Sequence, residues 1–314
     1  MSATVGWVVF SAIILALLVL DLGVLHRKPH EVRAKEAAIW WAVWVALAVV
    51  FNAGVFLTRG VTPGFQFSTG YLIELSLSID NVFVFVLLFD YFRVPARYQH
   101  RVLFWGIMGA LVMRGVMIGA GVLLIAKFHW ILYLFGAFLI YTAYQMAREG
   151  SPEVHPESNP VLRLLRRFVP MTRRYAGQRF FVRLPRRGGG YGGYAATPLL
   201  AVLLVVETTD VMFALDSIPA IFAVTRDPFI IYTSNVFAIL GLRSMYFVVA
   251  AVIRKFRYLR AALAVVLGFV GTKMILSDVV HVPAAASLGI VIAILAAAVV
   301  ASLARMPAAA ASRD

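Results

Sequence analysis

Nine apolar stretches follow one another along the chain, each about as long as the α-helix that crosses the hydrocarbon core of a membrane. They cover roughly residues 5–25, 37–57, 68–89, 102–125, 128–147, 198–224, 229–252, 259–277 and 282–303. Polar and apolar positions do not alternate within them, as they would in the strands of a membrane barrel. Inside lipid, backbone groups must find partners within the protein, which leaves spanning helices as the interpretation. We therefore expect an all-α membrane protein of about nine transmembrane helices.

The composition supports this class. Hydrophobic residues make up 62% of the 314 residues and charged residues 14%, whereas soluble proteins carry about 25% charged residues. The first apolar stretch is too long for the core of a signal peptide, and no basic segment precedes it, so we expect it to remain as the first helix. The chain has no cysteine, which excludes disulfides, thiolate metal sites and thiol chemistry.

The basic residues between the stretches predict orientation, because cytoplasmic loops are enriched in Lys and Arg. Of 29 such residues, 23 fall on one predicted side, 3 on the other and 3 within the stretches. We expect the N-terminus outside and the C-terminus in the cytoplasm. This asymmetry also accounts for the net charge of +14 without a nucleic-acid partner, and it makes anionic membrane lipids the expected contacts of the basic loops.

The longest connection, residues 148–197, separates helices 1–5 (residues 1–147) from helices 6–9 (residues 198–314). It is rich in Arg and Gly and is predicted to be cytoplasmic. Residues 180–184 and 194–197 flank the glycines and are candidates for a small hairpin. The alternative is a solvated linker attracted to anionic lipid. In either case this segment is no catalytic domain, and it is a candidate surface for a protein partner.

The third and sixth stretches share a motif in which two carboxylates lie six residues apart and a small polar residue follows directly. The motif residues are Glu74, Asp80 and Asn81 in the third stretch, and Asp210, Asp216 and Ser217 in the sixth. The next stretch in each case carries an arginine, Arg114 or Arg243. Residues 68–147 thus resemble residues 198–277. A repeated three-helix unit enters the membrane from the opposite side, so we expect two inverted repeats, helices 3–5 and 6–8, as in many secondary transporters.

Six carboxylates fall within the predicted spans, and each costs on the order of 3 kcal/mol at mid-bilayer. They are Asp21, Glu74, Asp80, Glu207, Asp210 and Asp216. Salt bridges to the bases Arg114, Arg243 and Lys273 are one explanation. Six acids exceed three bases, however, so a bound divalent ion or protons would have to neutralise the remainder. We favour an ion site, with the three bases balancing part of its charge.

Helix geometry limits which motif residues can meet, because positions seven apart share a face while positions six apart diverge by about 120°. Glu74 therefore aligns with Asn81, and Asp210 aligns with Ser217. The second carboxylate of each motif points elsewhere, although a break in the helices would let all of them converge. The donors are carboxylate, amide and hydroxyl oxygens, which suit the hard cations Mn²⁺, Mg²⁺ and Ca²⁺.

Four segments resemble the TerC/Alx family of bacterial membrane proteins, and the resemblance covers nearly the whole chain. The segments are ELSLSIDNVFVF (74–85), VVETTDVMFALDSIPAI (205–221), LDLGVLHR (20–27) and ATPLL (196–200). The resemblance implies the fold of the LysE-related transporters, a place in the bacterial inner membrane, and Mn²⁺ export linked to pH or metal stress. An older family name reflects tellurite resistance. The Gly-rich run at 186–194 departs from the tighter hairpin of relatives, which leaves only loop structure and partner binding in doubt.

The same resemblance implies which residues hold the ion. They are Glu74, Asp80 and Asn81, together with Glu207, Asp210, Asp216 and Ser217, and Asp21 corresponds to an acid of the family's first helix. The ion would be transported cargo, so no prosthetic group is expected.

Three classes of function compete. The first is a secondary exporter of Mn²⁺, and the second is a membrane scaffold of a tellurite or envelope-stress complex that docks through residues 148–197. The third, an intramembrane enzyme with paired acids, is the weakest, because no HExxH, Gly-x-Ser-x-Gly or P-loop motif occurs. A scaffold would tolerate loss of the acids but not of the loop, and a transporter would behave in the opposite way.

Overall fold

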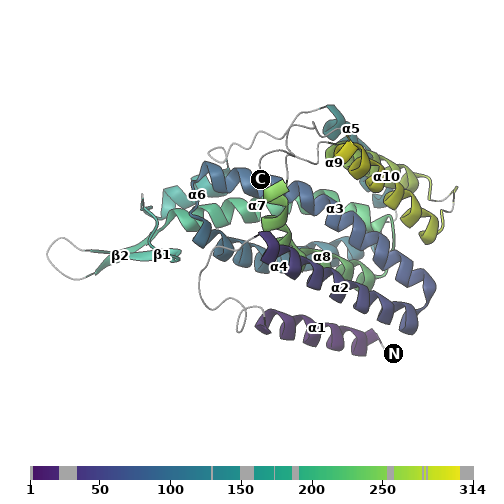
Figure 1. Ribbon diagram of the computed structural model, residues 1–314, viewed down its shortest axis with the longest axis horizontal. Coiled ribbons are helices and arrows are strands. Elements are labelled where there is room, and N and C mark those ends of the chain that lie inside the picture. Colours follow the sequence, from purple (N-terminus) through teal and green to yellow (C-terminus); the bar gives the residue numbers. More distant parts are fainter. Residues whose placement is uncertain are drawn as a thin grey trace.

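The computed structural model describes residues 3–20, 34–128, 130–148, 159–172, 174–185, 191–252, 258–277, 279–280 and 282–304. The long helices in these ranges are α1 (Ala3–Leu20), α2 (Ala34–Arg59), α3 (Val61–Tyr91), α4 (Ala96–Lys127), α5 (Ile131–Arg148), α7 (Pro198–Phe222), α8 (Pro228–Val252), α9 (Leu259–Ile275) and α10 (Ala284–Ala304) (Figure 1). A short helix α6 (Pro160–Phe168) and the strands β1 (Phe181–Pro185) and β2 (Tyr191–Ala196) lie between α5 and α7. Each of the nine apolar stretches therefore falls on one long helix.

The described helices are those of an all-α membrane protein. By length and composition, five of them qualify to cross a membrane, namely α2, α3, α4, α7 and α10. Their outer surfaces support this. On α4, the side chains of Val112, Val116 and Leu123 are 64%, 64% and 73% exposed, whereas the polar residues Ser76 and Asn81 of α3 are buried. Apolar groups outside and polar groups inside are the arrangement that lipid favours. The full set of nine spans stays a prediction.

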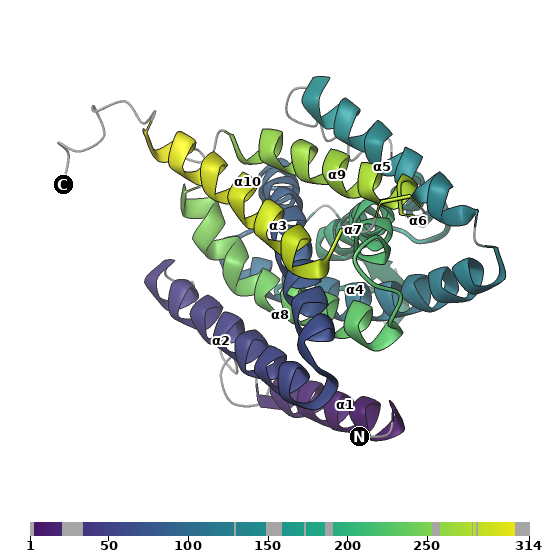
Figure 2. The same cartoon turned by 90° about the vertical axis from the view of Figure 1, so that its right-hand side faces the viewer.

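α3 is the central helix and packs against α8, α10, α2 and α7. α4 lies along α7 and α8, while α5 lies along α9 at the edge of the bundle away from α1 and α2 (Figure 2). Two hydrophobic clusters fill the interior. Phe51 and Phe237, with ring centroids 4.8 Å apart, belong to the one near α2 and α8, and Leu139 and Leu267 belong to the one near α5 and α9. α3 and α7 contribute to both clusters.

The two helices that carry the acidic motifs are continuous. α3 runs unbroken for 31 residues and α7 for 25, and Pro219 lies inside the last turns of α7 without ending it. A helix break near the motifs, one of the two arrangements considered from the sequence, is therefore wrong for this structure. The motif residues consequently keep the angular positions that a regular helix gives them.

α5 and α9 approach each other at a pair of glycines. A Cβ atom added to Gly271 would lie 2.8 Å from the carbonyl oxygen of Gly136, and one added to Gly136 would lie 3.0 Å from the carbonyl oxygen of Gly271. The contact is reciprocal, and it is backbone against backbone. Small residues that permit such an approach are typical of helix pairs in membranes.

The connections gather at two ends of the bundle. At one end Arg59, which closes α2, pairs with Asp227 before α8 at 3.0 Å, and Gly60 makes the turn into α3 with a φ of 100°. At the other end Tyr175 donates its hydroxyl to the carbonyl of Phe92, 2.8 Å away, between α3 and α4. Burial raises the pKa of Tyr175 to about 12, so the phenol remains a hydrogen-bond donor at neutral pH.

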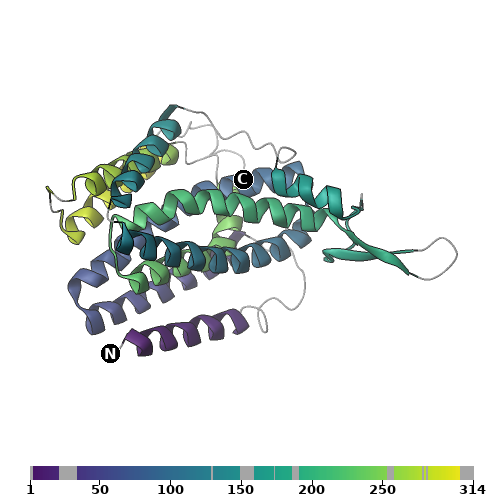
Figure 3. The same ribbon diagram turned by 180° about the vertical axis from the view of Figure 1, so that it is seen from behind.

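The segment between α5 and α7 is ordered where it is described. β1 and β2 pair antiparallel, with Phe181 opposite Ala196, so the predicted hairpin is confirmed. It projects beyond the helices at one end of the molecule (Figure 3). The short α6 was not expected from the sequence. Asn159 caps it by accepting from the backbone N–H groups of Val161 and Leu162 at 3.0 and 3.1 Å, and Leu162 is buried beneath it.

Candidate ion site

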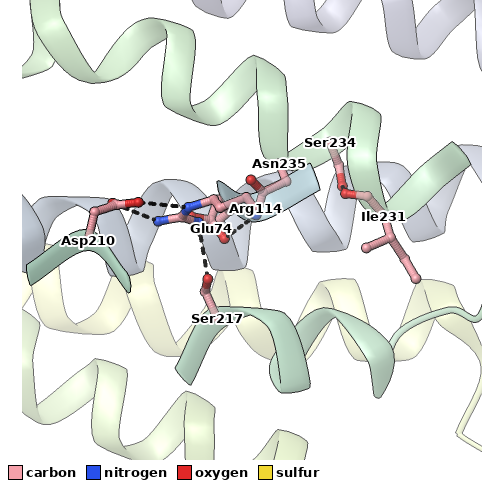
Figure 4. Close-up of polar contacts among 7 residues, drawn as sticks. All are labelled: Glu74, Arg114, Asp210, Ser217, Ile231, Ser234 and Asn235. Carbon is pink, nitrogen blue, oxygen red and sulfur yellow. Dashed lines mark hydrogen bonds and ion pairs between the residues drawn. The ribbon is translucent and has the colours of Figure 1, made fainter. Parts of the chain in front are cut away.

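The guanidinium of Arg114 on α4 lies between carboxylates from two other helices, Glu74 on α3 and Asp210 on α7 (Figure 4). Its Nη2 is 3.2 Å from Asp210 Oδ1, and its Nε is 3.4 Å from Asp210 Oδ2. Its Nη1 donates to Glu74 Oε1 and also to Ser217 Oγ, 3.1 Å away. All four side chains are buried. We call Glu74, Arg114, Asp210 and Ser217 the buried charge cluster.

The buried charge cluster joins the two halves of the chain. Glu74 belongs to the first acidic motif, and Asp210 and Ser217 belong to the second. Asp210 and Ser217 lie seven residues apart on one face of α7, so a single guanidinium can reach both. Ionised carboxylates on Glu74 and Asp210 carry two negative charges against one positive charge on Arg114. Removing one partner of a buried pair leaves the other charge uncompensated, which costs roughly 3–5 kcal/mol.

Asn235 on α8 extends the cluster, and sequence reasoning missed it. Its Nδ2 donates to Glu74 Oε2 at 2.9 Å, and the residue is fully buried. Its Oδ1 is buried without a hydrogen-bond partner among the described residues. The signal in the sequence was the polar run Thr233–Asn235 within an apolar stretch, since amides are costly at membrane depth. The hydroxyls of Thr233 and Ser234 donate back to their own helix, whereas the amide reaches another helix.

Glu207 lies one turn before Asp210 on α7 and is partly buried. Its carboxylate occupies the space in front of Gly109 on α4, where an added Cβ would come within 2.1 Å of Oε1. The glycine is therefore what lets the carboxylate lie against α4. The neighbouring Thr208 accepts from Asn159 at 2.7 Å, which ties the start of α6 to α7 beside Glu207.

Of the remaining motif residues, the structure describes the side chains of Asp216 and Asn81. Asp216 is partly buried and accepts a hydrogen bond from Thr142 Oγ1 on α5 at 3.1 Å. Neighbouring positions on a helix point about 100° apart, so Asp216 faces α5 while Ser217 faces Arg114. Asn81 is buried on α3, two turns beyond Glu74. Asp21 and the side chain of Asp80 lie outside the described part of the structure. Within the described ranges, no three acidic or histidine side chains gather closely enough to hold a metal ion.

The other two predicted bases also occupy separate places. Arg243 is buried on α8, eight residues beyond Asn235. Lys273 on α9 donates to Ser287 Oγ on α10 at 2.8 Å. It lines a cavity of about 500 Å³ together with Gln66, Thr225 and Ser277, near the end where Arg59 meets Asp227. Lys273 therefore contributes to a polar cavity at the end of the bundle, while Arg114 is the base between Glu74 and Asp210.

Fold and site together define a polytopic helical membrane protein with a buried ionic cluster at the meeting point of two acidic motifs. The chain belongs to the integral membrane protein TerC family, whose model matches residues 59–309.

Relatives match over nearly their whole length. An "Uncharacterized membrane protein STKORF319" from Myxococcus xanthus is 54% identical over 95% of this chain and 91% of its own. A protein of Escherichia coli strain K12 named "Putative membrane-bound redox modulator Alx" is 48% identical over 92% of this chain and 91% of its own. An "Uncharacterized membrane protein" from Rickettsia bellii is 37% identical over 96% and 97%. No solved structure matches this chain.

Proposed function

We propose that this protein is a secondary transporter of the bacterial inner membrane that exports a hard divalent cation, foremost Mn²⁺. The observation that carries the proposal is the meeting of Glu74 and Asp210, one from each acidic motif, at Arg114 in the buried interior. Ionisable residues buried at membrane depth are costly, and where they persist they mark ion or substrate pathways. No prosthetic group and no chemical reaction form part of this proposal.

The helix contacts support two inverted three-helix units, α3–α5 and α7–α9. Exchanging α3 with α7, α4 with α8 and α5 with α9 turns the α3–α8 contact into the α7–α4 contact, and both are extensive. The same exchange leaves the α5–α9, α3–α7 and α4–α8 contacts unchanged, and all three are present. A two-fold arrangement of this kind puts the site at the interface of the units, as in many secondary transporters. The proposal includes nine spans, α1 to α5 and α7 to α10.

The donor chemistry supports a hard ion. Every side chain of the buried charge cluster except Arg114 offers oxygen, and Asn235 adds an amide oxygen that has no hydrogen-bond partner among the described residues. Carboxylate, amide and hydroxyl oxygens favour Mn²⁺, Mg²⁺ or Ca²⁺ over soft ions. The name of the Escherichia coli relative points to redox modulation. This chain has no cysteine, so a thiol–disulfide reaction on the protein itself is excluded, and ion transport remains the function its buried groups suit.

Flux of Mn²⁺ in proteoliposomes tests the proposal. Wild-type protein should move Mn²⁺, and Glu74→Gln and Asp210→Asn should each lower the rate by about a hundred-fold or more, because each removes a charge in a low-dielectric site. Asp90→Asn is the matched control, since Asp90 also lies on α3 but is exposed near its end. Wild-type protein that moves no divalent cation would overturn the proposal.

A membrane scaffold is the second candidate, because α6 and the hairpin form an ordered surface with exposed basic residues. Arg163, Arg166 and Arg167 of α6 are exposed, next to the exposed side chain of Phe168. Replacing Arg166 and Arg167 by Gln should leave Mn²⁺ flux unchanged if the protein is a transporter. Metal or tellurite tolerance of cells that is lost in this variant, but kept in Glu74→Gln, would favour the scaffold.

A further inference from the structure

Every carboxylate oxygen of Glu74 and Asp210 already accepts a hydrogen bond from a protein donor. Arg114 Nη1 donates to Glu74 Oε1, and Asn235 Nδ2 donates to Glu74 Oε2. Arg114 Nη2 and Nε donate to the two oxygens of Asp210. The guanidinium thus supplies three of the four donors. In this state the two carboxylates are satisfied internally, and the group between them is a cation that belongs to the protein.

A transported ion at the same place would meet a competitor. A divalent cation bound by Glu74 and Asp210 needs the oxygens that now accept from Arg114. It would also place two positive charges beside a third in the protein interior, where the low dielectric makes like charges repel strongly. Guanidinium and metal ion are therefore alternatives between these carboxylates. Among the described residues Arg114 also has a neutral acceptor, Ser217 Oγ at 3.1 Å, which can hold the guanidinium when the carboxylates turn to the ion.

We propose that Arg114 is a tethered cation that competes with the transported ion for Glu74 and Asp210. While the guanidinium lies between the carboxylates it neutralises one of their two negative charges, an entering ion displaces it, and its return expels the ion. This inference rests on the proposed function and assigns Arg114 the step that releases the ion. A residue that only balanced charge would hold the ion's ligands in place, whereas a competitor weakens ion binding and speeds release.

Substitutions of Arg114 separate these roles, because competition predicts a gain in affinity. In purified protein, Arg114→Gln should bind Mn²⁺ at least about ten-fold more tightly than wild type. In proteoliposomes at saturating Mn²⁺ its turnover should fall about ten-fold, because the ion leaves slowly once nothing displaces it. Arg148→Gln on α5 is the matched control, since Arg148 is exposed and should leave both values unchanged.

Arg114→Lys keeps the charge and protects folding if Arg114→Gln does not fold. The lysine ammonium lacks the planar guanidinium whose N–H groups reach both carboxylates. It therefore competes less well with Mn²⁺ for Glu74 and Asp210, and Mn²⁺ affinity should rise by about three-fold. Unchanged or weaker Mn²⁺ binding in the folded variants would overturn the tethered-cation role. If wild-type protein transports Mn²⁺ in the same assay, only this inference fails. If wild-type protein neither binds nor transports Mn²⁺, the proposed function itself fails.

Discussion

At the scale of single residues, Asn235 contacts the buried charge cluster through a neutral amide. It is the described donor to Glu74 Oε2 and comes from α8, whereas Arg114 comes from α4. A carboxylate oxygen that loses its donor in a buried site costs about 1–3 kcal/mol, and more when it is charged. The Asn235 amide therefore stabilises the Glu74 carboxylate in addition to packing between α3 and α8.

Asn235→Leu should lower the thermal stability of the purified protein by about 1–3 kcal/mol, because Glu74 Oε2 would be left without a donor. The measurement is a thermal unfolding curve in detergent, alongside Ser234→Ala. Ser234 is equally buried, but its hydroxyl donates to the carbonyl of Ile230 on its own helix. Equal effects of the two substitutions would show that the Asn235 amide carries no special share of the stability.

Gly109 gives a second test at this scale, through the carboxylate of Glu207. Gly109→Ala would place a methyl group where the carboxylate now lies, so the flexible end of Glu207 must move. We expect little change in stability and a Mn²⁺ affinity lowered by about three- to ten-fold if Glu207 belongs to the ion path. Gly119→Ala is the matched control on the same helix, since an added Cβ there meets nothing within 4 Å. Unchanged affinity in Gly109→Ala would place Glu207 outside the path.

The sequence predicted part of the site and could not predict the rest. The seven-residue spacing correctly put Asp210 and Ser217 on one face, because it depends only on regular helix geometry. It could not show that one arginine from α4 reaches both motifs, because helix register across the bundle is set by packing. Asn235 was missed for the same reason. Its polarity was visible in the sequence, but its partner lies 161 residues away on α3.

At the scale of elements, helix positions were predictable and helix ends were not. The apolar stretch 68–89 lies within α3, which runs from Val61 to Tyr91, and the stretch 102–125 lies within α4, which runs from Ala96 to Lys127. Apolar residues mark the part of a helix that lipid or the core surrounds. Backbone hydrogen bonds continue beyond that part wherever neighbouring elements support them. The short α6 depends on its Asn159 cap and on one buried leucine, which hydropathy alone does not reveal.

The close approach of α5 and α9 predicts a strong effect from one methyl group. Gly271→Ala would place a Cβ 2.8 Å from the carbonyl oxygen of Gly136. This oxygen belongs to the backbone of α5, so it cannot turn aside as a flexible side chain could. We expect a loss of stability of about 1–3 kcal/mol from overpacking, measured by thermal unfolding in detergent. Gly268→Ala, one turn earlier on α9, should cost little, because its nearest atom would be 3.8 Å away. A Gly271→Ala protein as stable as Gly268→Ala would mean that the two helices separate without penalty.

At the scale of the whole molecule, the two ends of the bundle differ in architecture. The hairpin, α6 and the α3–α4 connection lie at one end, and the Arg59–Asp227 pair lies at the other. The absence of cysteine makes the orientation directly testable with single-cysteine variants and a membrane-impermeant maleimide. Thr62→Cys should react in intact cells, and Arg183→Cys should react only after the membrane is opened. The cysteine-free wild type is the control, and the reverse pattern of labelling would refute the predicted orientation.

Gly136 on α5 and Gly271 on α9 bring the third helices of the two proposed three-helix units into backbone contact. In the proposed two-fold exchange α5 and α9 take each other's place, so the axis would run between these two helices. A point on such an axis stays fixed while the units swap their tilts, so α5 and α9 would act as the fulcrum of the motion. Inward-facing and outward-facing forms would then be two equivalent arrangements of the same helices. The units would change from one to the other by rocking about the contact between α5 and α9, without repacking the core.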